Sequence, residues 1–160
     1  MRPRDHVMFL DEVEVMMAVR GVDGFQELTG VYENGDNLCI VSLYAGQPLN
    51  AWLRDTRPTE DQRVQVALHV SGAVDRLHDL GLAHLDLHEE NVCVEVKDGQ
   101  VKVTIIDFGM AKFVAREDIN PLALMANGRN RDANKVHDLV QLCLYYGEVD
   151  EPQDHGIDEA

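Results

Sequence analysis

Three oxygen-bearing side chains in the middle of the sequence have the types and spacing of a site for phosphoryl transfer. Asp86 and the amide Asn91 lie in a dense polar segment, residues 84–91, and Asp107 follows two short apolar runs. If those runs form a hairpin, Asp107 returns to the strand end beside Asn91. An amide oxygen and a carboxylate together make a hard-oxygen site suited to Mg²⁺. Asp86 is then left nearby as a base that can orient a hydroxyl, and the pattern predicts phosphoryl transfer.

The elements on either side of this segment are well marked in the sequence. Thr59, with Gln62 three residues later, forms a capping box that predicts a helix over residues 60–80, and Gly81 suits its end. The runs 92–96 and 101–106 alternate in polarity and are separated by Asp98-Gly99, which predicts a hairpin with a tight turn. The polar segment is therefore expected between a buried helix and a hairpin.

The remaining segments are predicted from periodicity and turn residues. Residues 5–20 and 49–54 are expected to be helical, and the runs 27–32 and 38–44 around Asn34-Gly35 to form another hairpin. Residues 111–131 lack sustained periodicity and are expected to form a long loop before a helix over residues 132–146. Residues 148–160 carry six acids and no Lys or Arg, which predicts a disordered tail.

The order of the polar motifs is similar to that of a known family. His-x-Asp-Leu-x-x-x-Asn over residues 84–91, followed by Asp-Phe-Gly at 107–109, resembles the catalytic loop and metal-binding motif of eukaryotic protein kinases. The resemblance covers about residues 5–146. It implies an α+β, protein-kinase-like fold truncated at both ends. The implied parts are a partial N-lobe over residues 1–44, a partial helical C-lobe over residues 45–146 and an acidic tail over residues 147–160.

The resemblance also implies roles for individual residues. Asp86 would be the catalytic base, and Asn91 and Asp107 would hold Mg²⁺ against the phosphates of ATP. The nucleotide would contact the gatekeeper position, the hinge and the next hairpin, which are Ser42, Leu43, Tyr44, Ala45 and Cys93. The implied reaction moves the γ-phosphate of ATP to a protein hydroxyl, with serine or threonine favoured over tyrosine.

Further positions match the internal framework of the family. Glu12 would be the glutamate of the N-lobe helix, and Asp138 would be the acid that hydrogen-bonds the backbone of the catalytic loop. The buried stack that joins the two lobes would consist of Met16, Leu28, His84 and Phe108.

Several features depart from the family pattern. The glycine-rich loop and its following lysine are expected before the N-lobe helix, yet only four residues precede Asp5 and no lysine precedes Lys97. Leu85 replaces the usual arginine of the catalytic loop, and His88 replaces a lysine. No Ala-Pro-Glu follows Gly109. These departures leave a pseudokinase fragment, acting as a binding or regulatory module, as an alternative function.

The histidines of the polar segment allow two further interpretations. His88 also resembles the catalytic loop of small-molecule kinases of the aminoglycoside and choline type. His84, Asp86 and His88 alternate along the chain and could converge on zinc. The downstream histidines, His137 and His155, are poorly placed to complete such a site, so His84 is expected to be a packed core residue.

Composition limits the partners. The 160 residues carry 29 acids against 14 Lys and Arg, a formal net charge of −15, which argues against a nucleic-acid or anionic-membrane surface. The three cysteines are far apart and do not form a disulfide framework. With no apolar stretch long enough to span a membrane, we expect a cytoplasmic protein. The expected partners are ATP, a protein substrate and a protein that covers the exposed face of the N-lobe.

Overall fold

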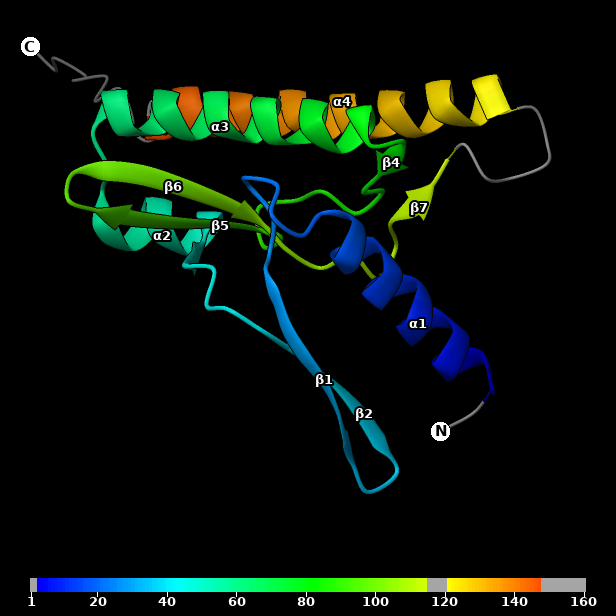
Figure 1. The fold of residues 1–160 in the computed structure, drawn as a ribbon. Helices are drawn as coiled ribbons and strands as arrows, with labels where there is room; N and C mark the ends of the chain where they lie inside the picture. The colour runs from blue at the N-terminus through cyan, green and yellow to red at the C-terminus, as the bar shows by residue number, and fades with distance from the viewer. Residues whose placement is uncertain (1–2, 115–120, 148–160) are drawn as a thin grey trace, which may run out of the picture.

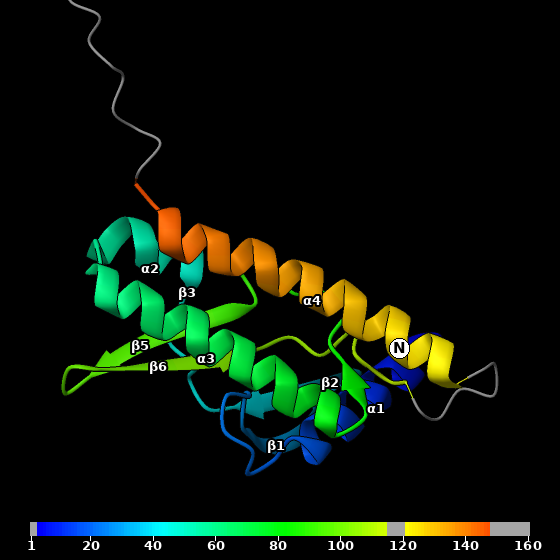
Figure 2. The same ribbon diagram turned by 90° about the horizontal axis from the view of Figure 1, so that it is seen from above.

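The structure is a computed structural model that describes residues 3–114 and 121–147, with side chains for residues 6–114 and 128–147. The predicted acidic tail at residues 148–160 lies outside these ranges. Two long helices, α3 and α4, lie side by side above the hairpin formed by β5 and β6 (Figure 1). Figure 2 shows the same two helices from above, running antiparallel across the sheet. The described elements mix helices with small antiparallel sheets, as the predicted α+β class requires.

Helix α3, Glu60–Asp79, begins and ends where the sequence predicts. The hydroxyl of Thr59 accepts the N–H of Gln62, and the Gln62 side chain accepts the N–H of Thr59, so both bonds of the capping box form. Gly81 takes a positive φ of 75°, which glycine adopts without steric cost and which ends the helix. Helix α4, Pro121–Tyr145, packs along α3 and closes the core above the sheet.

The predicted hairpin after the polar segment forms β5, Val92–Lys97, and β6, Gln100–Ile105. Asp98 and Gly99 both have positive φ at the turn, and Val92 pairs with Ile105 at the open end of the ladder. Strand β3, Gln47–Pro48, pairs with the outer edge of β5, and α2, Leu49–Thr56, follows it directly. Helices α2, α3 and α4 share one buried cluster with β5 and β6, which includes Leu49, Trp52, Leu53, Val66, Val70, Val92, Val94, Val103 and Leu139.

The N-terminal part consists of α1, Pro3–Ala18, and the hairpin of β1, Leu28–Asn34, with β2, Asn37–Ser42. Val15 and Met16 of α1 and Val19, which follows the helix, are buried in a second cluster. This cluster continues to Leu77 of α3 and to Phe108. The hairpin extends away from the long helices (Figure 1). The expected helix and hairpin are therefore present, with ends shifted by one or two residues.

The prediction of a long loop over residues 111–131 is wrong. Strand β7, Lys112–Phe113, pairs with β4, Leu82–Ala83, and α4 begins as early as Pro121. Proline suits the first turn of a helix, whereas Asn and Gly in the following turns hide the helical pattern. Packing overrides this weak propensity, because Gly128 lies against Ala83 and Arg129 donates to the carbonyl of His78. None of the helices in the described ranges is long and apolar enough to cross a membrane.

Candidate active site

A buried acid of α4 binds the backbone of the polar segment that follows β4. Asp132 is only 1% exposed, and its two carboxylate oxygens accept the backbone N–H groups of His84, at 2.8 Å, and Leu85, at 2.9 Å. The imidazole of His78 in α3 lies 2.9 Å from the same carboxylate. These contacts offset the cost of Leu85, a branched residue held at a positive φ of 66°. The segment is thereby fixed in a conformation that presents Asp86.

Asp138, which the resemblance assigned to this role, does not fill it. Its side chain is exposed on α4, six residues after the acid that binds the loop. The assignment is wrong because it followed the expected start of the last helix at residue 132. Asp132 stands at the edge of the stretch expected to be a loop, and no local pattern separates it from other surface acids.

His84 is a core residue with both ring nitrogens engaged. Its Nε2 lies 2.9 Å from the carbonyl of Ile106, and its Nδ1 accepts the N–H of Asp86 at 3.2 Å. Burial lowers the pKa of His84. Its ring lies 5.5 Å from that of Phe108, and Met16 and Leu28 are buried in the cluster that contains Phe108. The zinc interpretation has no support, since no group of three metal-ligating side chains occurs in the described part of the chain.

Asp86 shares a compact polar network with Asn91 and His88. The Asn91 amide nitrogen donates to the Asp86 backbone carbonyl at 2.9 Å and to its carboxylate at 3.3 Å. It also lies 3.0 Å from His88 Nε2, which is 3.8 Å from the Asp86 carboxylate. Because the amide nitrogen faces Asp86, the amide oxygen of Asn91 is left to meet a cation. Asp86 is itself half-buried, with access to solvent.

The hairpin brings Asp107 next to Asn91. The N–H of Ile106 donates to the Asn91 carbonyl at 2.9 Å, so the two residues lie at adjacent strand ends. Asp107 has a positive φ of 62°, and its exposed carboxylate accepts the N–H of Gly109 at 3.2 Å. A carboxylate and an amide oxygen placed in this way fit the donor set that Mg²⁺ prefers.

Glu12 of α1 faces the same region. Partial burial raises the pKa of Glu12, and the negative charge of Asp107 raises it further. Two carboxylates therefore approach each other here, and no ion pair to Glu12 occurs among the described residues.

The predicted nucleotide residues lie at the junction between the N-terminal part and the sheet. Ser42 Oγ accepts from the Gln26 side chain at 2.6 Å, and the N–H of Leu43 donates to the Glu27 carbonyl. The backbone N–H of Leu43 is therefore already engaged, and its carbonyl is the backbone group left to bind adenine. Tyr44 is 80% exposed, and Cys93 is buried in β5, where desolvation raises the pKa of its thiol.

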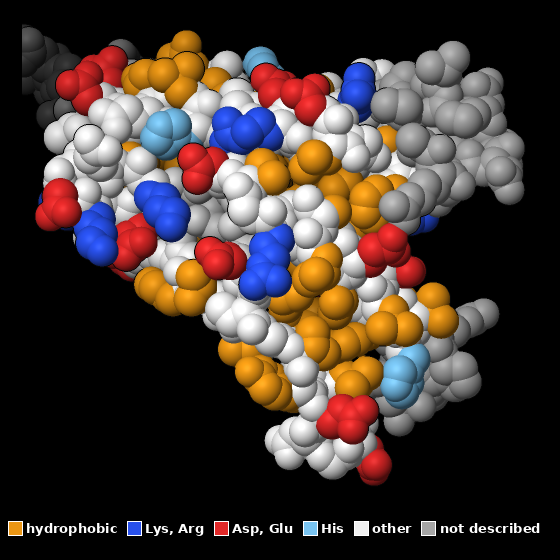
Figure 3. All heavy atoms as spheres, viewed as in Figure 1, with side chains coloured by type: hydrophobic (Ala, Val, Ile, Leu, Met, Phe, Trp, Pro, Cys, Tyr) orange, Lys and Arg blue, Asp and Glu red, His pale blue; other side chains and the backbone are white. Residues whose placement is uncertain are grey.

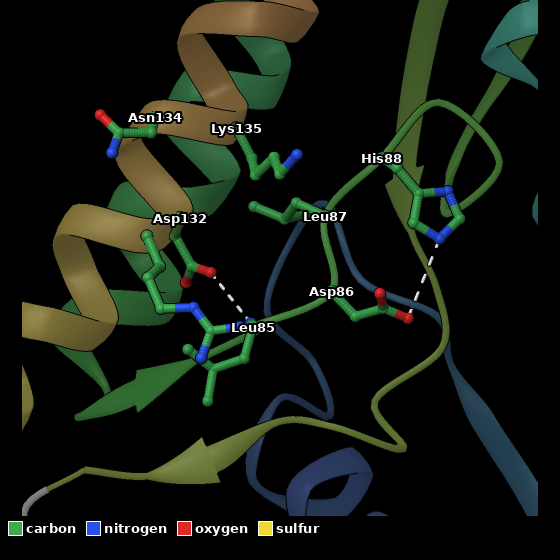
Figure 4. A pocket seen from close by; sticks show the side chains of 8 residues that line it. Leu85, Asp86, Leu87, His88, Asp132, Asn134 and Lys135 are labelled. Atoms are coloured by element: carbon green, nitrogen blue, oxygen red, sulfur yellow. Dashed lines mark hydrogen bonds and ion pairs between the residues drawn. The ribbon is translucent and has the colours of Figure 1, made fainter.

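A pocket of about 380 Å³ opens beside Asp86. The polar segment and α4 form its walls, which consist of Leu85, Asp86, Leu87, His88, Arg131, Asp132, Asn134 and Lys135. Lys135 extends from α4 toward the polar segment, while the Asp86 carboxylate points toward His88 (Figure 4). The contribution of α4 to this pocket was missed in the sequence, because the pocket depends on where that helix docks.

Several known proteins are similar in sequence to this chain. A family described as "Protein kinase domain" matches residues 2–126. The serine/threonine-protein kinase spe-6 of Caenorhabditis elegans is 35% identical over 116 residues, which cover 66% of this chain and 29% of that protein. The ovarian-specific serine/threonine-protein kinase Lok of Drosophila melanogaster is 29% identical over 105 residues, covering 59% of this chain and 22% of Lok. The chain thus spans less than a third of the length of these relatives.

A solved structure shares the fold. The crystal structure of the Rad53 kinase domain and SCD2 matches with a TM-score of 0.68 at 24% identity, over 86% of this chain and 51% of that one. The family match covers most of the sequence, and the neighbour shares the fold. The chain belongs to the protein kinase family.

Proposed function

We propose that this chain carries the catalytic loop and the metal-binding strand end of an ATP-dependent protein kinase that phosphorylates serine or threonine. The observation that carries the proposal is the placement of Asp86, Asn91 and Asp107 around two adjacent strand ends. Both named relatives are serine/threonine kinases, which supports this acceptor class over tyrosine.

In this proposal Asp86 performs the proton chemistry. Its carboxylate accepts the proton of the acceptor hydroxyl as the hydroxyl oxygen attacks the γ-phosphorus and ADP leaves. Asn91 holds Asp86 in place through two hydrogen bonds from its amide nitrogen. Asn91 and Asp107 would also hold Mg²⁺, which when bound neutralises charge on the phosphates. The hinge Leu43–Ala45, with Ser42 and Cys93, would contact the adenine.

The test uses the whole protein that contains this chain. Asp86→Asn should lower turnover about 10²–10⁴-fold, because it removes the base, while Mg-ATP binding persists. Asp107→Asn should weaken Mg-ATP binding itself, measured by calorimetry. Asp138→Asn, an exposed change on α4, is the control and should leave both unchanged. Turnover of Asp86→Asn near that of the unmodified protein would contradict the proposal.

The acceptor is tested in the same assay. Because His88 lies 3.8 Å from Asp86 and also resembles a residue of small-molecule kinases, aminoglycosides and choline are compared with a Ser/Thr protein substrate. Transfer to the protein alone is the expected result. Transfer only to a small alcohol would replace the protein substrate in the proposal.

A second candidate function is a regulatory module without catalysis. It is favoured by the approach of Glu12 and Asp107. Burial and the charge of Asp107 raise the pKa of Glu12, and the two carboxylates would repel the phosphates of ATP. This candidate requires that the whole protein binds no Mg-ATP in calorimetry and that Asp86→Asn changes no measurable reaction.

We also propose that a protein partner covers the face formed by α1 and the β1–β2 hairpin. Orange apolar side chains gather over these elements in the lower half of Figure 3. Their exposed members are Val7, Met8, Leu10, Met17, Val31, Tyr32 and Val41. Patches of this kind mark contact surfaces, so Met17→Glu should reduce self-association or partner binding in light scattering.

The three cysteines of the chain are free in the structure, which supports the predicted cytoplasmic location.

A further inference from the structure

Two basic residues of α4 open onto the pocket that holds Asp86. Arg131 and Lys135 are four residues apart, so they lie on the same face of the helix about one turn from each other. Both are exposed, and both line the pocket together with Asp86 and His88. Lys135 reaches from the helix toward the polar segment at Leu87 (Figure 4). The two cations therefore line the same pocket as the proposed catalytic base.

The charges of the pocket are not balanced by its own acids. Among the described residues, the ion pairs of the pocket join His78 with Asp132 and His88 with Asp86, and neither includes Arg131 or Lys135. Asp132 is buried and turns its carboxylate toward the polar segment and His78. The Asp86 carboxylate points to His88, on the side away from α4 (Figure 4).

The two cations of this pocket lie in a chain that is strongly acidic as a whole. Acids outnumber Lys and Arg by 29 to 14, and only four lysines occur in the sequence. A surface with this excess of acid repels an anionic ligand at long range, so a local pair of cations decides where an anion can bind. The guanidinium of Arg131 suits a carboxylate or phosphate through paired hydrogen bonds, and Lys135 adds a point charge.

We propose that Arg131 and Lys135 select an acceptor segment in which an anionic side chain lies next to the hydroxyl to be phosphorylated. The inference rests on the proposed function, because it takes Asp86 as the base that receives the hydroxyl. The pocket volume of about 380 Å³ falls in the range of sites that hold small ligands or a few side chains. The anionic group is either the carboxylate of Asp or Glu or a phosphate on a neighbouring residue, and both share the chemistry that the two cations recognise.

Peptide binding tests this selection without requiring activity. Fluorescent peptides with one serine flanked by Glu, by phosphoserine or by Gln are titrated against the whole protein and followed by anisotropy. We expect the acidic peptides to bind about tenfold more tightly than the Gln peptide, the factor that two partly exposed ion pairs supply. Equal affinity for the Gln peptide would overturn the proposal, and the Glu and phosphoserine arms show which anion is preferred.

Matched charge reversals locate the site. The double variant R131E/K135E should lose the preference, whereas K97E/K102E should keep it. The control changes the net charge by the same amount at another pocket, lined by Lys97 and Lys102 on the β5–β6 hairpin. Loss of the preference in the control alone, or equally in both variants, would contradict the assignment to α4. R131Q/K135Q should lose the preference without added repulsion, which guards against misfolding of the reversed variant.

Different experimental results would contradict the proposed function and this inference. Asp86→Asn should lower phosphate transfer about 10²–10⁴-fold and keep the preference for acidic peptides. If Asp86→Asn keeps transfer, the catalytic assignment fails while the peptide preference can still be measured. If transfer depends on Asp86 but acidic and neutral peptides bind alike, the selection by Arg131 and Lys135 fails alone.

Discussion

The carboxylate of Asp132 in α4 accepts a hydrogen bond from the backbone N–H of Leu85, at 2.9 Å, immediately before the proposed base. The same carboxylate binds the N–H of His84 and the ring of His78. One side chain therefore joins α3, α4 and the polar segment. The geometry of Asp86 depends on this acid even though Asp132 is itself buried.

Removing this acid should destabilise the fold strongly. Asp132→Ala leaves the N–H groups of His84 and Leu85 without their partner, and we expect a loss of about 3 kcal/mol in the free energy of unfolding. Urea denaturation of the 160-residue chain measures it. The matched control is Asp138→Ala, an exposed acid of the same helix, which should change stability by less than about 0.5 kcal/mol. Similar losses for the two variants would show that the loop contacts contribute little.

The hydrogen bonds of Asp132 also predict how the free energy of unfolding depends on pH in the acidic range. Burial opposes the charge of Asp132, but the hydrogen bonds from His78, Leu85 and His84 outweigh it, and the pKa of Asp132 lies below its usual value. A lowered pKa in the folded state stabilises the protein above the unfolded pKa of 3.8, and this contribution is lost as the pH falls through the folded value. Asp132→Asn should therefore flatten the acid limb of the stability profile, measured as the denaturation midpoint between about pH 2 and pH 6. An unchanged acid limb would contradict the assignment.

The pH dependence of stability contributed by Glu12 should have the opposite sign to that of Asp132. Burial and the charge of Asp107 raise the pKa of Glu12 above its unfolded value of 4.5. Its contribution is complete below that value and is lost as the pH rises through the folded pKa. Glu12→Gln should therefore raise the melting temperature at pH 7 and leave it unchanged at pH 4. Asp11→Asn, an exposed change on the same helix, serves as the control. A lower melting temperature for Glu12→Gln at pH 7 would contradict this sign.

The sequence predicts best those elements whose ends are set by residues close to them in the chain. The helix Glu60–Asp79 and the hairpin Val92–Ile105 were predictable, because Thr59 with Gln62 and Asp98 with Gly99 fix their ends through neighbours in the chain. The polar segment was found by its residue types. Asp132 was not found, because its partners His78, His84 and Leu85 are 47 to 54 residues away along the chain. Only the docking of α4 on α3 and β4 distinguishes it from Asp138.

Because Leu85 stands where the family has an arginine, we predict that phosphorylation between Gly109 and Lys135 does not control the activity of the protein. In the family pattern an arginine at this position meets a phosphorylated side chain, but leucine has no charge and no donor. The sequence from Gly109 to Lys135 also contains no Ser, Thr or Tyr. Phosphopeptide mapping of the whole protein should find no phosphorylated residue in this segment. Phosphatase treatment should therefore not change the activity by removing a phosphate from this segment. A site there that tracks activity would require a modified residue of another type.

Two helical glycines should respond to alanine in opposite directions. A Cβ at Gly128 of α4 would lie 3.0 Å from the Cβ of Ala83 and 3.1 Å from a methyl of Val114, so α4 would be pushed away from β4. At Gly72 of α3, the nearest atom is the terminal nitrogen of Arg76, at 3.4 Å, which can move aside. Alanine in a helix interior is favoured over glycine by up to about 1 kcal/mol. Gly72→Ala should therefore stabilise the chain by a fraction of that amount, whereas Gly128→Ala should destabilise it, because overpacking costs about 1–3 kcal/mol. Urea denaturation of both variants measures the difference, and stabilisation by Gly128→Ala would mean that α4 does not pack closely against β4.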